Sequence, residues 1–123
     1  MVIKKILLVE DDFFLLDILS QRFKKSGFDV SVARDGEECL KVLESEKPDI
    51  ILLDILMPKL DGFEVLRRMQ GSPALSLIPV IVLSNLGQKE DIEKAKNLGA
   101  KDFIIKANFT TKEIIEKINS FKL

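Results

Sequence analysis

The sequence lacks several residue types on which common protein chemistries depend. It contains no histidine, which excludes a Ser-His-Asp triad, a histidine-ligated zinc site and a phosphohistidine of its own. Its one cysteine, Cys39, cannot form an internal disulfide, and the start of the chain has no signal-peptide pattern. Both features favour a reducing, cytoplasmic compartment. Without a long apolar segment, no membrane role is expected either.

An excess of charge of one sign is also missing. Lys and Arg number 19 against 20 Asp and Glu, which gives a formal net charge of −1. The chain therefore has no overall basic field to hold a nucleic-acid backbone, and we expect no direct nucleic-acid binding. With 123 residues, 46% of them hydrophobic and 32% charged, the composition is that of one globular domain spanning residues 1–123.

Five short apolar runs predict the strands of a sheet, at residues 6–9, 29–34, 50–53, 80–83 and 103–105. Four of them are almost uninterrupted, as is typical of parallel strands in a sheet whose two faces are both buried. The run at 29–34 alternates polar and apolar residues, which indicates a partly exposed strand at an edge.

Segments of helical period follow each run, at residues 12–25, 36–46, 61–70, 88–98 and 110–121. Thr110 and Glu113 have the spacing of a capping box, so the last helix should begin near Thr111. Gly27 and Gly99 are expected to end two other helices in the left-handed conformation that glycine adopts readily. The pattern predicts an α/β fold: one doubly wound, five-stranded parallel sheet in the order 2-1-3-4-5 with five helices.

Polar side chains stand at the ends of four of these strands. Glu10 and Asp11 follow the first strand, Asp54 follows the third, Ser84 ends the fourth and Lys106 the fifth. In the order 2-1-3-4-5, the first and third strands are neighbours whose helices lie on opposite faces, so a crevice opens beyond their carboxyl ends. We expect the functional site in this crevice.

The residue types at this crevice suit phosphoryl chemistry on a metal. Three carboxylates would raise one another's pKa unless a cation neutralised them, and their oxygen ligands suit Mg²⁺ or Mn²⁺. Lys106 and Ser84 add a positive charge and a hydroxyl donor, which stabilise a transferring phosphoryl group. Asp54 is the natural nucleophile, since carboxylates can form acyl phosphates. Singly, each residue could be a helix cap or a surface charge; together they favour a phosphoacceptor.

Four stretches of the sequence carry a family pattern: residues 6–12, residues 48–58 with Asp61-Gly62, residues 79–84 and residues 99–106. In order and spacing they resemble the receiver domain of two-component response regulators, over nearly the whole chain. The resemblance implies that Asp54 accepts a phosphoryl group from a sensor histidine kinase or a phosphotransfer protein. Glu10 and Asp11 would hold Mg²⁺ together with Asp54 and the backbone carbonyl of Leu56.

The resemblance further implies a signalling switch that catalyses only its own phosphoryl uptake and hydrolysis. Ser84 and Lys106 would contact the phosphoryl oxygens, and Phe103 would turn inward behind Ser84. This would change the surface of the fourth helix, the fifth strand and the fifth helix. A simple core role for Phe103 is the alternative, because aromatic side chains at strand ends are usually buried for their area. A phosphorylation-dependent homodimer also stays open.

The sequence departs from the family pattern at three positions. Asn85 stands where Ala or Gly is usual, and it is bulkier beside the phosphate entrance. Ala107 replaces a proline that usually follows the lysine through a cis bond; without proline a cis bond costs about 3–4 kcal/mol, so we expect a trans bond. Phe103 lacks the hydroxyl that many relatives carry as Tyr. None of the three departures removes a chemical group from the site.

Two further hypotheses concern partner choice and phosphate lifetime. The first helix carries more apolar surface than one core stripe needs, so Phe14 and Ile18, flanked by Gln21, are candidates for kinase docking. A broad buried stripe is the alternative.

The second hypothesis concerns Leu56, Asn85 and Leu86, which surround the expected phosphate. Leucines cannot orient an attacking water, so we expect a long-lived phosphorylated form unless both turn away from the site.

Three other identities compete with this one. A haloacid dehalogenase-type phosphatase needs a second acid two residues after its nucleophile, where this chain has Leu56. A flavodoxin needs a phosphate-binding loop after the first strand, where acids stand instead. A pseudo-receiver that only binds partners stays the main alternative. The chain is either a single-domain regulator or a receiver from a longer protein.

Overall fold

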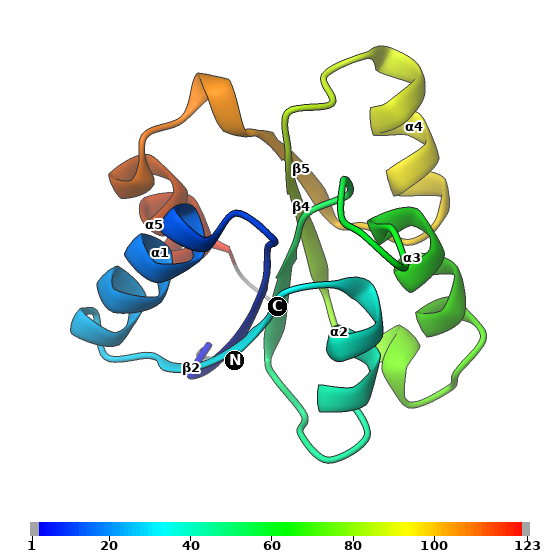
Figure 1. Ribbon diagram of the computed structural model, residues 1–123, viewed down its shortest axis with the longest axis horizontal. Coiled ribbons are helices and arrows are strands. Elements are labelled where there is room, and N and C mark those ends of the chain that lie inside the picture. The colour runs from blue at the N-terminus through cyan, green and yellow to red at the C-terminus, as the bar shows by residue number, and fades with distance from the viewer. Residues whose placement is uncertain (1–2, 122–123) are drawn as a thin grey trace.

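A computed structural model describes residues 3–121 as a sheet covered by helices on both faces (Figure 1). Strands and helices alternate along the chain, joined by short loops and two 3₁₀ turns. In chain order the elements are β1 Lys5–Val9, α1 Phe13–Lys25, β2 Asp29–Ala33, α2 Gly36–Val42, β3 Ile50–Leu53, α3 Gly62–Gln70, η1 Leu75–Leu77, β4 Val80–Ser84, α4 Lys89–Asn97, β5 Asp102–Ile105, η2 Lys106–Asn108 and α5 Thr111–Ser120.

The five strands pair in parallel in the order β2-β1-β3-β4-β5, which confirms the predicted topology and the edge position of β2. Residues 103–105 form β5 at the opposite edge, where the predicted order places them. Ile104 is nevertheless fully buried, and Phe103 and Ile105 are partly buried. An apolar run reports that helices cover both faces of a strand; it carries no information about a free edge.

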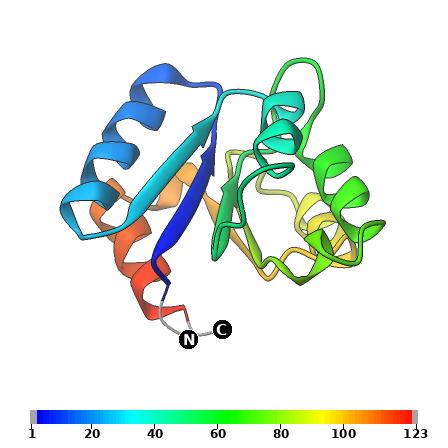
Figure 2. The ribbon, with the colours of Figure 1, turned by 90° about the horizontal axis from the view of Figure 1, so that it is seen from below.

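Two apolar clusters fill the space between the sheet and its helices. Leu7 and Val9 face the cluster that contains residues of α2, α3 and α4, whereas Ile6 and Leu8 face the cluster of α1 and α5. Figures 1 and 2 show these two groups of helices on opposite sides of the sheet. Both faces of β1 are thus buried, as its uninterrupted apolar run predicts. Cys39 lies in the first cluster, where burial raises the pKa of its thiol to about 12.

The helix ends follow from local sequence signals. Thr110 and Glu113 form the predicted capping box of α5, and Gly27 and Gly99 have φ angles of 94° and 102°. The expected helix at 36–46 ends instead at Val42. Its last predicted residue, Glu46, binds the Ser31 hydroxyl at 2.6 Å and Lys5 Nζ at 2.8 Å, which draws this segment toward the sheet. Elsewhere the predicted bounds agree within one residue.

The neighbouring strands β1 and β3 send their following helices to opposite faces. α1 packs on one face and α3 on the other, so the chain opens a crevice at the carboxyl ends of β1 and β3. Among residues 3–121, no helix is both long enough and apolar enough to cross a bilayer.

Candidate functional site

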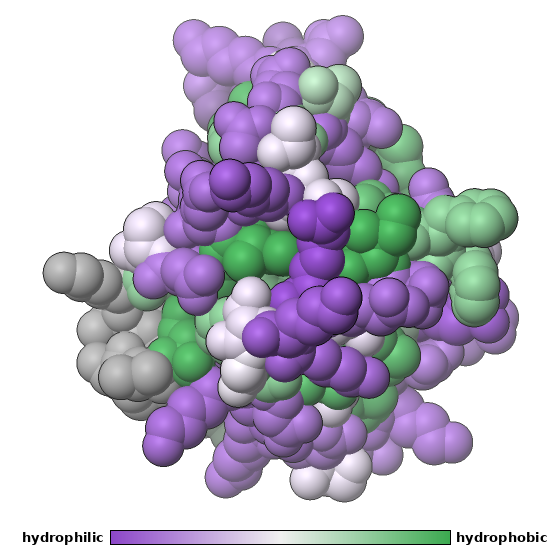
Figure 3. All heavy atoms as spheres, turned by 90° about the vertical axis from the view of Figure 1, so that its left-hand side faces the viewer, coloured by the Kyte–Doolittle hydropathy of each residue, from purple (hydrophilic) through white to green (hydrophobic). Residues whose placement is uncertain are grey.

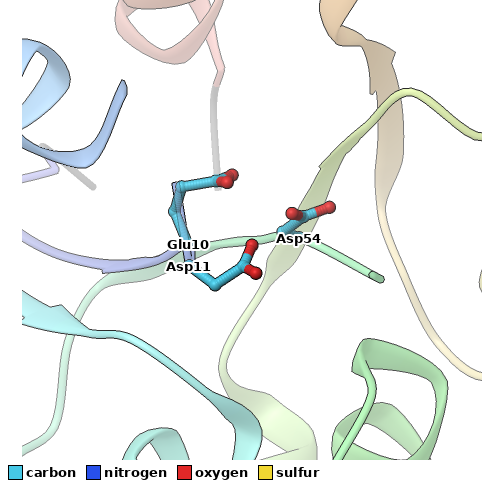
Figure 4. Close-up of side chains that lie close together, drawn as sticks. All are labelled: Glu10, Asp11 and Asp54. Atoms are coloured by element: carbon cyan, nitrogen blue, oxygen red, sulfur yellow. The ribbon is translucent and has the colours of Figure 1, made fainter. Parts of the chain in front are cut away.

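Three carboxylates meet at the carboxyl ends of β1 and β3. Glu10 and Asp11 directly follow β1, and Asp54 directly follows β3, where its backbone N–H donates to the Val9 carbonyl at 2.9 Å. One oxygen from each of the three carboxylates lies within 4.8 Å of the others. Figure 4 shows Asp11 and Asp54 reaching into the same space, with Glu10 above them. Glu10 and Asp54 are buried, while Asp11 is exposed.

Lys106 brings a positive charge to these acids from the end of β5. Its Nζ donates to Glu10 Oε1 and to Asp54 Oδ2, both at 3.0 Å. Burial, together with the nearby charge of Asp54, raises the pKa of Glu10 to about 7 although Lys106 opposes the shift. Burial disfavours the charged form of Lys106, but its bond to Glu10 and the charge of Asp54 outweigh it and raise the lysine pKa. The site is thus a tightly paired, partly desolvated charge cluster.

The backbone around Asp54 fixes the direction of its carboxylate. Asp54 Oδ1 accepts from the backbone N–H of Ile55 at 2.7 Å and, more weakly, from that of Leu56 at 3.4 Å. Gly62, the first residue of α3, donates its N–H to the Ile55 carbonyl at 2.9 Å. A side chain at Gly62 would collide with the Asp54 carbonyl oxygen, so glycine lets α3 begin directly beside the site.

The donor set fits a hard divalent cation. Glu10 Oε2 is buried and has no hydrogen-bond partner among the described residues, although Lys106 Nζ lies 2.8 Å away. Glu10, Asp11 and Asp54 each offer one carboxylate oxygen close enough to the others for the three to share a cation. An all-oxygen set with room for waters is what Mg²⁺ and Mn²⁺ prefer. Leu56, two residues after Asp54, carries the predicted backbone ligand in the adjoining loop.

Ser84 and Phe103 lie on the strands beyond β3. Ser84 ends β4 fully buried, and its Oγ accepts from the Leu86 backbone N–H at 3.3 Å. Phe103 is partly buried and packs against the apolar cluster of α2, α3 and α4.

The three residues expected to tune phosphate lifetime have different surroundings. Leu56 is 56% exposed. Leu86 is partly buried against the same apolar cluster as Phe103. Asn85 is exposed, and its Oδ1 accepts from the backbone N–H of Ala107 at 3.1 Å. The Lys106–Ala107 peptide bond is trans, as predicted.

The first helix leaves an apolar surface uncovered. Phe14 is 79% and Ile18 is 44% exposed, and Gln21 is exposed beside them. Figure 3 shows apolar surface between polar side chains on the side of the molecule where α1 and α5 lie. Sequence reasoning missed Phe13, which is 58% exposed and has the Arg34 guanidinium 5.3 Å above its ring. The paired phenylalanines at the start of α1 were the available signal.

This fold and this cluster of carboxylates and lysine define a signalling domain of the receiver type. Residues 6–119 match the family model described as the response regulator receiver domain. The chain belongs to this family and is a receiver domain of two-component response regulators.

Known proteins from several organisms are similar to this chain. The alkaline phosphatase synthesis transcriptional regulatory protein PhoP of Bacillus subtilis is 37% identical over 117 residues, which are 95% of this chain and 48% of PhoP. The chain thus spans about half the length of the curated relatives it matches. The receiver domain of Francisella response regulator 1452 has a TM-score of 0.86 at 31% identity, over 94% of this chain and 93% of that one. The phosphorylated cyanobacterial phytochrome response regulator RcpA has a TM-score of 0.83 at 31% identity, over 96% and 90%.

Proposed function

We propose that this domain, residues 1–123, is a phosphorylation switch in which Asp54 takes a phosphoryl group from a sensor histidine kinase or a phosphotransfer protein. The observation that carries the proposal is the setting of Asp54. Its buried carboxylate lies between two further acids and a lysine that donates to it at 3.0 Å. A carboxylate surrounded in this way is both a nucleophile and part of a cation site. The similarity to phosphorylated RcpA supports the proposal.

In the proposed transfer, a carboxylate oxygen of Asp54 forms a bond to phosphorus while the bond from phosphorus to the donor's histidine nitrogen breaks. The electron pair of that bond leaves with the imidazole nitrogen, and the product on Asp54 is an acyl phosphate. Bound Mg²⁺ or Mn²⁺, held by Glu10, Asp11, Asp54 and the Leu56 carbonyl, would neutralise charge on the phosphoryl oxygens.

Lys106 and Ser84 are the proposed contacts of the phosphoryl group. Lys106 already donates to Asp54 Oδ2, so its ammonium can shift to a phosphoryl oxygen over a short distance. The Ser84 hydroxyl accepts from Leu86, which leaves its own proton free to donate. Such a bond would draw the end of β4 toward the site, and Phe103 would move with it. The proposed output is therefore a changed surface on α4, β5 and α5.

The proposed kinase-docking surface consists of Phe14, Ile18 and Gln21 on α1. Two of these are exposed apolar side chains, and such a contiguous surface commonly marks a partner site. We propose that the domain acts in the cytoplasm and does not itself contact nucleic acid, in keeping with its net charge of −1. The name of PhoP describes it as a transcriptional regulatory protein, and such a role here would require a separate output module.

The test of this function is the mass of the intact protein after incubation with acetyl phosphate and Mg²⁺. We expect a gain of one phosphoryl group for the wild type and for Asp91→Asn, a control in the first turn of α4. Asp54→Asn, and the wild type with the metal chelated, should gain none. A folded wild type that gains no mass would instead support a pseudo-receiver that acts only by binding partners.

A further inference from the structure

The β4 and β5 strands are joined once more beyond the end of their hydrogen-bonded ladder. Their last aligned pair is Ser84 with Ile105. One residue past β4, Asn85 Oδ1 accepts from the backbone N–H of Ala107, two residues past β5, at 3.1 Å. Asn85 directly follows Ser84, and Ala107 directly follows Lys106. The bond thus connects the neighbours of the two proposed phosphate-contacting residues.

Ala107 belongs to the short turn η2, Lys106–Asn108, which starts at the lysine itself. The Lys106 side chain must reach from this turn to Glu10 and Asp54. The turn makes few other contacts, because Ala107 and Asn108 are exposed. Within the turn, the Phe109 N–H donates to the Lys106 carbonyl at 3.3 Å. A hydrogen bond to the middle of the turn therefore limits how far the Lys106 main chain can shift.

The loop that carries Asn85 is itself held against β5. Gly87 approaches Ile105 so closely that a Cβ at position 87 would lie 3.3 Å from Ile105 Cδ1. Leu86 donates its N–H to Ser84 Oγ at 3.3 Å. Contacts to Ser84 and to Ile105 therefore hold the loop that carries Asn85 in place. Alanine or glycine at 85 has no side-chain acceptor, and proline at 107 has no N–H. The bond therefore requires a side-chain acceptor at 85 and a residue other than proline at 107, and this chain has both.

We infer that Asn85 is a positioning residue for Lys106, acting through the Ala107 N–H. This inference rests on the proposed phosphoacceptor function and adds a residue that acts through the lysine. In this chain the Asn85–Ala107 pair supplies the restraint on the turn that keeps the ammonium directed at the carboxylates. Loss of the bond should slow phosphoryl uptake at saturating Mg²⁺ and leave the carboxylate cluster itself in place.

A first experiment measures the bond without any phosphoryl chemistry. Amide hydrogen exchange at Ala107, followed by NMR, should accelerate about two- to tenfold in Asn85→Ala, the range that one hydrogen bond accounts for. The control is Asn108→Ala, which removes an exposed side-chain amide from the same turn and should leave the exchange rate of the Ala107 backbone N–H unchanged. Equal Ala107 exchange in wild type and Asn85→Ala would overturn the inference, whether or not the protein takes up phosphate.

A second experiment tests whether the bond acts through Lys106. Uptake from acetyl phosphate at saturating Mg²⁺ is compared in wild type, Asn85→Ala, Ala107→Pro and the double variant. Asn85→Ala should slow uptake about two- to tenfold when Ala107 is present, and it should have no effect in the Ala107→Pro background, where the N–H donor is already absent. An equal effect in both backgrounds would show that Asn85 acts only by its bulk at the entrance, and would overturn the positioning role.

Discussion

Lys106 and Glu10 form an ion pair across the sheet, with Lys106 Nζ 2.8 Å from Glu10 Oε2, although β3 and β4 separate their strands. The lysine reaches over the carboxyl ends of both intervening strands to do so. It thereby holds together the two buried acids of the site, since the same Nζ also donates to Asp54. This arrangement makes Lys106 a charge partner in the resting protein and a candidate contact for an arriving phosphoryl group.

Replacing Lys106 by methionine should slow phosphoryl uptake from acetyl phosphate about 100-fold, because a preorganised positive charge would be lost at the transferring group. The measurement is the rate of mass gain at saturating Mg²⁺. Lys101→Met removes an exposed lysine before β5 and serves as the matched control, with an unchanged rate expected. Equal rates for Lys106→Met and wild type would contradict the assigned role.

Substitution of Phe14 or Ile18 by alanine should slow transfer from the cognate kinase about tenfold, as expected when an apolar anchor is lost from an interface. Phosphorylation by acetyl phosphate should not change, because these side chains are exposed on α1 and do not belong to the carboxylate cluster. The control is Leu77→Ala, which truncates an 83% exposed leucine in η1 and should leave both transfer rates unchanged. Equal slowing with both donors would indicate disturbed folding and argue against a docking role.

Leu56→Asn should shorten the lifetime of the phosphorylated protein about two- to tenfold, since an amide at this exposed position can hold an attacking water. Loss of the phosphoryl mass in excess Mg²⁺ is the readout. The companion variant Leu86→Glu should act in the same direction, but Leu86 is partly buried, so its folding must be checked by circular dichroism. Unchanged or slower hydrolysis in both variants would refute the role of the leucines.

Thr110→Ala should lower the free energy of unfolding by about 1 kcal/mol, because the Glu113 N–H at the start of α5 would lose its cap. Urea unfolding followed by circular dichroism measures this loss. Thr111→Ala changes the first helical residue without touching the cap and should cost less. A cost for Thr111→Ala that equals or exceeds that of Thr110→Ala would show that the capping box contributes little.

Much of the fold could be predicted from the sequence because each strand and helix carries its own local signal. Uninterrupted apolar runs marked β1, β3 and β4, and their order brought Glu10 and Asp54 to the same crevice. The edge position of β5 followed from the predicted order of the strands and had no local signal of its own, since helices bury both of its faces. Local periodicity reports how deeply a face is buried, and it cannot report which backbone edge lacks a partner.

The Asn85–Ala107 hydrogen bond is a different kind of omission. Each residue stood out in the sequence as a departure from the family pattern, but the two are 22 positions apart in different loops. Whether they meet depends on loop conformation, which composition and periodicity do not determine. Phe13 could have been noticed beside Phe14, but its contact with Arg34 depends on the tertiary structure.

The identity of the phosphorylated residue tests the proposed role of Asp54 more directly than any rate. After incubation with acetyl phosphate and Mg²⁺, borohydride reduction converts an aspartyl phosphate to homoserine, which peptide mass spectrometry can locate in the chain. We expect homoserine at position 54 alone, and none when the metal is chelated. Homoserine in place of Asp11 or Asp12, or a phosphoryl group retained on Ser84, would contradict the assignment of Asp54 as the phosphoacceptor.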